Sequence, residues 1–453
     1  MPFTSDPVAV EDFTTTTPED RPNIRWFVCF LLFAATTINY MDRSVLSLIE
    51  PLLHLPFMGW VPGLDAKFQV AYHLNYGHIV ESFQIAYALG FLIAAPFIDR
   101  LGTKTGYALA ITVWAISSLS HSLVASVLGF CVARFFLGLG ESGNFPAAIK
   151  ATTEWFPTEE RALATGLFNS GANAAFFIAP ALLPFVTTRF GWRAAFICTS
   201  SLGVVWLVAW LLFPYNRLRR ASSTTQENLS HVLPRTTGWP LYQGILQNRG
   251  LYAFAVGKGL TDPVWWFYLF YLPMFLHDNY GLDLKAAYWP IVIVYAVSSV
   301  GSIGGGALSG AIMRRGQTVN AGRKLTLLLM AVCVLPIVFV PYMHTVSPHS
   351  PWPAVGLIAL AAAAHQGWSA NLYSTVTDMF PSTSVGTVIG WGGAVGSLGG
   401  ALFTWLVSHY FALHPLPIFI LAATAYLLAL GVFHLLVPRL GAPSMPDIPI
   451  GVA

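Results

Sequence analysis

Charged residues are scarce in this chain of 453 residues: Asp, Glu, Lys and Arg make up 9%, and hydrophobic residues make up 55%. A soluble globular domain carries roughly 25% charged residues, so this composition excludes one. The four cysteines (Cys29, Cys131, Cys198 and Cys333) stand singly in apolar stretches and form no CxxC pair. A disulfide framework and a metal site are therefore not expected, and no cofactor is predicted.

The chain also lacks the short alternating segments of a transmembrane β-barrel. Its apolar stretches are about 20 residues long, enough to cross ~30 Å of hydrocarbon as helices. We therefore predict an all-α integral membrane protein with twelve transmembrane helices, at about residues 24–50, 77–98, 106–124, 127–149, 162–187, 193–213, 251–276, 287–312, 325–343, 353–377, 384–408 and 415–437. The Thr-rich first 23 residues have no apolar core, so they are expected to be a disordered tail and not a signal peptide.

The distribution of basic residues predicts the orientation in the membrane. Most of the 23 Lys and Arg residues fall in the loops and tails on the side of both termini. The loops on the other side hold Lys67, Arg189, Arg193 and Lys285. By the positive-inside rule, both termini are expected in the cytoplasm. The net charge of +3 then reflects topology and is no argument for nucleic-acid binding.

An internal repeat divides the chain into two halves. Glu154-Trp155-Phe156-Pro157 is followed by Gly166, and Asp378-Met379-Phe380-Pro381 is followed by Gly390 at the same spacing. Both follow the fourth predicted helix of their half; chance similarity in glycine-rich membrane sequence is the alternative. Two such halves are typical of secondary transporters. The predicted organisation is a tail (1–23), a six-helix bundle (24–213), a cytoplasmic linker (214–250), a second bundle (251–437) and a tail (438–453).

Ionisable side chains stand inside two of the predicted helices, where they are costly and usually functional. The first helix contains Asp42 and Arg43, and the fourth contains Arg134 and Glu141. A guanidinium binds a carboxylate in bidentate fashion, so Arg43 is a candidate ligand for a substrate carboxylate; a fixed ion pair with Asp42 or Glu141 is the alternative. Both acids are candidate proton carriers, and a fixed packing bridge between Arg134 and Glu141 is the competing interpretation.

Several stretches together resemble the major facilitator superfamily, and within it the anion:cation symporters. The first is the loop motif Gly90…Asp99-Arg100-Leu101-Gly102-Thr103-Lys104, in which Thr103 replaces the usual basic residue. The other stretches occur in the same order as in that family. They are Asn39-Tyr40-Met41-Asp42-Arg43, Arg134…Gly140-Glu141-Ser142-Gly143-Asn144-Phe145-Pro146, Glu154-Trp155-Phe156-Pro157 and Phe168-Asn169-Ser170-Gly171-Ala172-Asn173. Two further stretches are similar to bacterial hexuronate (galacturonate and glucuronate) transporters, namely Thr261-Asp262-Pro263-Val264-Trp265-Trp266-Phe267-Tyr268 and His365-Gln366-Gly367-Trp368-Ser369-Ala370-Asn371. The long first outer loop, about Pro51–Tyr76, departs from this pattern.

The resemblance implies a carboxylate-binding Arg43 and proton coupling through Asp42 and Glu141, with Arg134 beside them. Other polar and aromatic side chains are candidate sugar ligands, namely Asn39, Tyr40, Tyr87, Asn169, Asn173, Trp265, Trp266, Gln366, Trp368, Ser369, Asn371 and Trp391. For Asn169 and Asn173, packing between helices is an equal alternative.

The remaining candidates are expected to serve gating or structure. Lys258 and Asp262 stand i, i+4 and should form a salt bridge or gate near the cytoplasmic side. Pro263, next to Asp262, should kink or break the helix. Asp99, Arg100 and Gly102 belong to the loop motif, and His365 is expected to be a packed histidine.

The expected function is proton-coupled import of a hexuronate by a monomer in the bacterial inner membrane. The partners are then an anionic sugar acid, protons and lipid. An aldonate, a tartrate-like diacid or an aromatic acid is the alternative substrate. A membrane-embedded enzyme would need a catalytic cluster or metal set, which the sequence does not show.

Overall fold

The structure is a computed structural model that describes residues 22–49, 56–59, 61, 70–222, 239–282, 288–410 and 415–440. Within these ranges the chain is helical and contains no strand. Most of the two predicted tails, most of the first outer loop and the middle of the linker lie outside the described residues.

Long helices occupy the predicted apolar stretches. They are α1 (Pro22–Ile49), α2 (Val70–Leu101), α3 (Thr103–Ser120), α4 (Val127–Glu141), α5 (Asn144–Trp155), α6 (Thr158–Phe190), α7 (Trp192–Leu212), α11 (Arg249–Tyr280), α12 (Tyr288–Arg314), α13 (Val319–Val334), α15 (Trp352–Met379), α16 (Val385–Tyr410) and α17 (Pro415–Leu436). Short elements join them, namely η3 (Pro56–Met58), α8 (Tyr215–Ser222), α10 (Trp239–Gln247), η5 (Leu335–Phe339) and α14 (Val340–Val346).

Two predicted helices are interrupted in the structure. The fourth is divided into α4 and α5 around Ser142 and Gly143, and the ninth is divided into α13, η5 and α14. Proline explains both interruptions, because Pro146 and Pro336 have no N–H to donate to the carbonyl four residues earlier.

Of the two outcomes expected at Pro263, a kink or a break, the break is wrong, since α11 runs unbroken from Arg249 to Tyr280. The glycine-rich α16 packs on α11 at this point. A Cβ on Gly399 would meet both the Gly259 carbonyl oxygen and the Pro263 ring. A neighbouring helix at this distance supports the backbone where the proline removes a hydrogen bond, as membrane proteins commonly allow.

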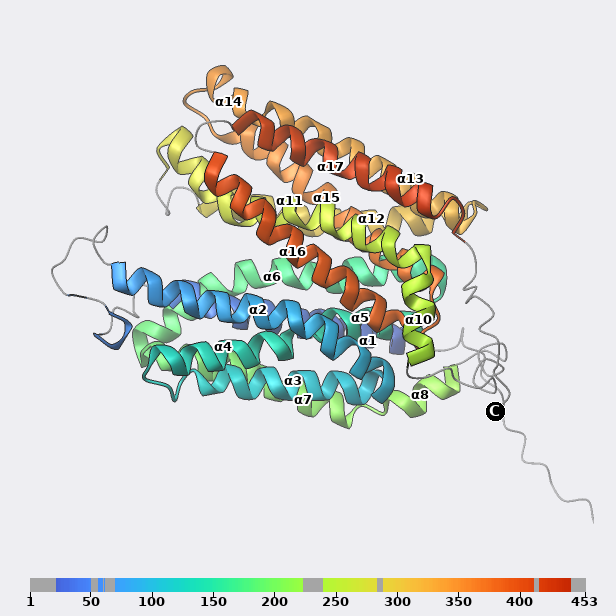
Figure 1. Ribbon diagram of the computed structural model, residues 1–453, viewed down its shortest axis with the longest axis horizontal. Coiled ribbons are helices and arrows are strands. Elements are labelled where there is room, and N and C mark those ends of the chain that lie inside the picture. The colour runs from blue at the N-terminus through green and yellow to red at the C-terminus, as the bar shows by residue number, and fades with distance from the viewer. Residues whose placement is uncertain are drawn as a thin grey trace, which may run out of the picture.

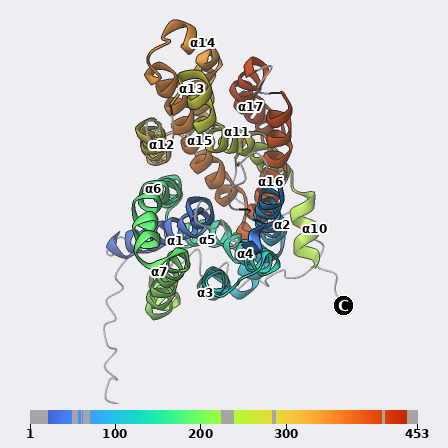
Figure 2. The same cartoon turned by 90° about the vertical axis from the view of Figure 1, so that its left-hand side faces the viewer.

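The helices form two groups that lie against each other. Helices α1 to α7 make up one group and α11 to α17 the other, shown below and above in Figure 1. Across the boundary, α6 packs on α12 and α16 packs on α2, as the end-on view of Figure 2 shows. We call the two groups the first and second halves.

The outer surface of the molecule is apolar and its interior contains charge. Seven helices of the described residues are long and apolar enough to cross a membrane. Large apolar side chains such as Leu128, Val205 and Leu435 are exposed, whereas Asp42 and Glu141 are buried. This is the reverse of a soluble protein and identifies a multi-pass membrane protein.

Glycines bring the two halves into backbone contact at corresponding positions. A Cβ on Gly166 of α6 would meet the Ser302 carbonyl of α12, and a Cβ on Gly390 of α16 would meet the Phe91 carbonyl of α2. These are the two glycines at equal spacing in the sequence repeat. Each glycine of the repeat therefore lies at a close crossing of the two halves, α6 with α12 and α16 with α2.

The halves are also tied together near α8 and α10, at what we call the linker end, defined by Asp99, Arg161, Arg323 and their partners. Arg161 Nη1 donates to the Thr377 carbonyl at 3.0 Å, and Arg323 Nη2 donates to the Thr158 carbonyl at 2.9 Å. These bonds close the linker end of the molecule.

Gly166→Val is expected to weaken this closure, because backbone atoms of α12 cannot move aside for the added side chain. The thiol of a Thr377→Cys variant, in a background without the native cysteines, should then react several-fold faster with a soluble maleimide. Gly304→Val on α12 is the matched control, since a Cβ there meets nothing within 4 Å. Equal labelling rates in the Gly166→Val and Gly304→Val variants would contradict the role of Gly166 in closing the linker end.

Candidate functional site

A cavity of about 70 Å³ lies between the two halves. This is room for several water molecules. Both halves contribute to its wall, and the lining residues are Tyr40, Arg43, Tyr87, Phe91, Phe145, Asn169, Ala172, Lys258, Asp262, Trp265, Trp266, His365, Gln366, Ser369, Tyr373, Gly393 and Ser397. The wall thus combines aromatic rings, amides, two cations and the carboxylate of Asp262, which suits a polar ligand.

Arg43 is held at the cavity by an acid and by aromatic rings. Its Nη2 and Nε donate to Glu141 Oε2 at 3.0 and 3.2 Å. Its guanidinium carbon lies 4.6 Å from the ring centroids of both Tyr40 and Tyr87. The two rings and the carboxylate hold the guanidinium in one position. In this structure Arg43 is both a cavity residue and the partner of Glu141.

The buried acids of the first half have unused hydrogen-bonding atoms. Asp42 Oδ1 accepts from Ser118 Oγ at 2.6 Å. Within the described part of the chain, Asp42 Oδ2, Glu141 Oε1 and two nitrogens of Arg134 have no hydrogen-bond partner. The alternative of a fixed Arg134–Glu141 bridge does not occur, because Glu141 pairs with Arg43 instead. Both acids therefore retain an oxygen on which a proton can sit.

Lys258 and Asp262 form the predicted salt bridge, with Lys258 Nζ 2.7 Å from Asp262 Oδ2. Lys258 Nζ also donates to the Tyr373 hydroxyl at 3.0 Å. Both residues line the same cavity as Arg43, a place that the sequence did not predict for them. The site therefore holds two cations, one from each half, each paired with a carboxylate.

On α15 the cavity face is rotated from the predicted one. His365, Gln366, Ser369 and Tyr373 line the cavity, and at about 100° per residue they share one side of the helix. Trp368 lies outside that arc and packs edge-on against Tyr426, with ring centroids 5.4 Å apart.

Asn371 also leaves the cavity face, because its Nδ2 donates to the Gly305 and Gly367 carbonyls, each at 2.9 Å. It therefore ties α15 to α12. Asn39, Asn173 and Trp391 are likewise not among the lining residues. These five predicted ligands lie outside the cavity wall.

The other predicted ligands meet at the cavity. Asn169 Nδ2 donates to Gln366 Oε1 at 2.6 Å, which connects the two halves. Trp265 stacks on His365, with centroids 5.2 Å apart and planes at 11°. His365 thus packs as expected, yet it also lines the cavity, while the Trp266 indole forms part of the same wall.

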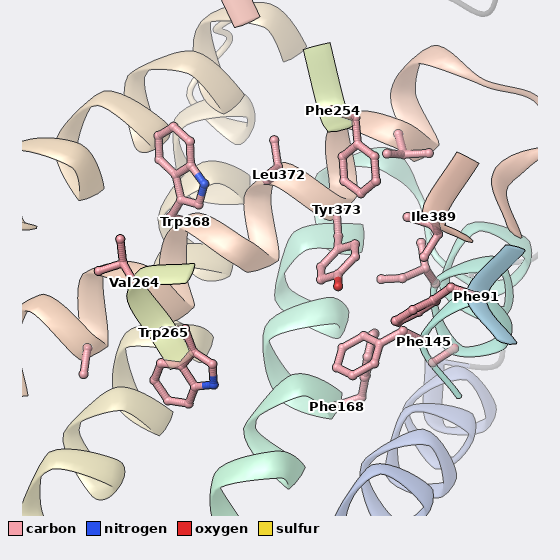
Figure 3. Close-up of a cluster of buried hydrophobic side chains, with 14 of the residues drawn as sticks. Phe91, Phe145, Phe168, Phe254, Val264, Trp265, Trp368, Leu372, Tyr373 and Ile389 are labelled. Carbon is pink, nitrogen blue, oxygen red and sulfur yellow. The ribbon is translucent and has the colours of Figure 1, made fainter. Parts of the chain in front are cut away.

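Sequence reasoning missed Phe91, Phe145, Ala172, Tyr373, Gly393 and Ser397 as lining residues. For Tyr373 the sequence did contain an indication, because Tyr373 follows the predicted ligand Ser369 by four residues and therefore shares its helix face. Figure 3 shows the Tyr373 ring between Phe254 and Phe145. Phe145 belongs to the first half, and its ring stacks on Tyr373 at 5.6 Å.

The loop motif closes the linker end instead of lining the cavity. Asp99 accepts from the backbone N–H of Thr387 at 2.6 Å and from Lys150 Nζ at 2.9 Å. It thereby caps the start of α16 from the other half. Gly102 has a φ of 82°, which favours glycine, and the Arg100 guanidinium lies 5.9 Å from the Tyr242 ring.

Comparison with known proteins gives consistent findings. Residues 32–404 match the family described as Major Facilitator Superfamily. The chain is 29% identical to the hexuronate transporter of Escherichia coli K12, over 86% of each chain. It is 28% identical to the galacturonate transporter of Dickeya chrysanthemi, over 58% of this chain and 74% of that one.

A solved structure of a proton:xylose symporter superposes with a TM-score of 0.74 at 14% identity. The match covers 93% of this chain and 97% of that one. At this identity the likeness concerns the fold alone.

Proposed function

Because the chain belongs to the Major Facilitator Superfamily and is a membrane transporter, not an enzyme, we propose that it imports a sugar acid together with a proton. The proposed substrate is a hexuronate such as galacturonate or glucuronate. The relatives named for hexuronate and galacturonate transport support this choice.

One observation carries the proposal: Arg43 lines the cavity between the halves, held by Tyr40, Tyr87 and Glu141. A guanidinium fixed in place binds a carboxylate with little loss of side-chain freedom. The low dielectric of the surroundings strengthens this charge contact. Arg43 is therefore the proposed clamp for the carboxylate of the sugar acid.

The rest of the wall suits a sugar ring more than a small diacid. Asn169, Gln366 and Ser369 offer donors and acceptors for hydroxyl groups, and the indoles of Trp265 and Trp266 offer apolar faces. Sugar rings present both kinds of surface. An aldonate or another organic anion on the same clamp is the second candidate.

We propose that the side chain of Glu141 carries the coupled proton. The carboxylate of Glu141 and the carboxylate of the substrate compete for the same guanidinium of Arg43. A proton on Glu141 removes its charge, weakens its hold on Arg43 and leaves the clamp to the substrate. Asp42, which also keeps an oxygen without a hydrogen-bond partner among the described residues, is the alternative carrier, and Arg134 is the third member of the proposed coupling network.

Alternating access is proposed to proceed by rocking of the two halves about this cavity. The bonds of Asp99, Arg161 and Arg323 close the linker end here. Opening that end would release the substrate. The proposed setting is a monomer in the inner membrane of a bacterium, with both termini in the cytoplasm.

Purified protein in proteoliposomes should accumulate galacturonate or glucuronate when an inward proton gradient is imposed. When an ionophore collapses the gradient, the internal substrate concentration should rise only to the external concentration. A parallel thermal-shift screen over hexuronates, aldonates, tartrate and phthalate identifies the substrate class. Stabilisation by the other anions and not by hexuronates would overturn the assignment, and gradient-independent uptake would overturn the proton coupling.

A further inference from the structure

The cavity contains a second cation that the proposed function does not use. Lys258 is 4% exposed, and its ammonium group contacts Asp262 at 2.7 Å and Tyr373 at 3.0 Å. Tyr373 stacks on Phe145 of the other half (Figure 3). The ammonium group is thus held at the cavity by a ring that reaches across the boundary between the halves.

The two ion pairs of the cavity differ in where their acids lie. The Glu141 side chain is fully buried behind Arg43, whereas the Asp262 side chain is 19% exposed and is part of the cavity wall. Gly396 of α16 leaves the space for this carboxylate, because a Cβ there would meet Asp262 Oδ2. Arg43, Lys258 and Asp262 therefore line one cavity, which a single ligand would share with all three.

A lysine beside an aspartate has a different preference from a lysine alone. The pair offers one donor and one acceptor, which is what a hydroxyl group needs. A second carboxylate that approached Lys258 would also come close to the like charge of the Asp262 carboxylate, which is unfavourable at a desolvated site.

We propose that Lys258 and Asp262 bind the hydroxyl-bearing end of the sugar acid, and that the Asp262 charge excludes diacids. This proposal rests on the proposed function and adds its selectivity. The site then accepts six-carbon monoanions such as galacturonate and rejects galactarate, which carries a carboxylate at both ends. Arg43 in the first half and Lys258 in the second half contact opposite ends of one substrate.

The test is displacement of labelled galacturonate from the purified full-length protein by unlabelled galacturonate or galactarate. In Asp262→Asn, the ratio of the galactarate to the galacturonate half-displacement concentration should fall by about tenfold, because Lys258 is no longer neutralised. Asp262→Glu keeps the charge, so it should restore most of the selectivity that Asp262→Asn loses.

An unchanged ratio in Asp262→Asn that still binds galacturonate would overturn the inference. Lys258→Met combined with Asp262→Asn leaves no unpaired charge, so it serves as a second test where the single variant does not fold. Its affinity for galacturonate should fall by about tenfold, whereas a purely structural ion pair predicts the original affinity. Failure of the unmodified protein to bind any sugar acid would instead overturn the proposed function.

Discussion

Replacing Arg43 by alanine is expected to abolish uptake of the sugar acid while the protein still folds and reaches the membrane. Arg43 is the cavity cation whose guanidinium is held between two rings and a carboxylate. Loss of a desolvated charge contact costs about 2–5 kcal/mol, or roughly 30- to 5,000-fold in affinity. The variant also leaves the buried Glu141 without its cation, which favours protonated Glu141 and cannot restore the clamp.

The measurement is initial uptake and equilibrium binding of labelled galacturonate, with protein amount checked by size-exclusion chromatography. Arg43→Lys separates charge from geometry, because it keeps the cation but not the bidentate fork, so intermediate binding is expected. Arg189→Ala, at the end of α6 and away from the cavity, is the control and should transport normally. Normal uptake by Arg43→Ala would remove the clamp from the mechanism.

Glu141→Gln is expected to separate binding from accumulation. The amide cannot exchange a proton and holds Arg43 less tightly than a carboxylate does, so the substrate should bind at least as well as before. Binding should also become insensitive to the proton gradient. In proteoliposomes the variant should exchange labelled for unlabelled galacturonate, yet the internal concentration should only approach the external one.

Glu159→Gln is the matched control, because Glu159 lies exposed in the first turn of α6. It should accumulate substrate as the unmodified protein does. If Glu141→Gln still concentrates galacturonate under a proton gradient, the coupling proton is carried elsewhere. Asp42→Asn is then the next variant, since Asp42 also keeps an oxygen without a hydrogen-bond donor among the residues that the structure describes.

The paired glycines show how far a sequence pattern reaches. The equal spacing of Gly166 and Gly390 from their Phe-Pro pairs indicates two related halves. The structure adds that each glycine meets a carbonyl of the opposite half. No pattern within one half specifies that partner, because the contact depends on how α6 crosses α12 and how α16 crosses α2.

The sequence predicted residues of the candidate site where a polar or charged side chain stands out in an apolar helix. Arg43 and Tyr87 line the cavity, and each was marked by a polar or charged group in an apolar helix. Trp368 and Asn371 were marked in the same way, yet both contact other helices instead. Their side of α15 faces α12 and α17, and a helix with polar groups around its circumference does not reveal which side faces the centre.

For Lys258, the sequence predicted the ion-pair partner, Asp262, but did not predict that the pair lines the cavity. The i, i+4 spacing to Asp262 is a local property of a helix, and the structure has that ion pair at 2.7 Å. Its position at the cavity follows from the unbroken course of α11 through Pro263. That course depends on the packing of Gly399 on the helix at this point.

The sequence by itself determined that this protein is helical, lies in a membrane and carries ionisable groups in its interior. Apolar length, charge content and spacing along one helix are properties of short segments, and they act before any tertiary contact forms. Only the tertiary structure decided that Glu141 pairs with Arg43, that the cavity has a cation from each half, and which side of α15 lines it. These are contacts between helices far apart in the chain, and the close packing that selects them has no counterpart in a local pattern.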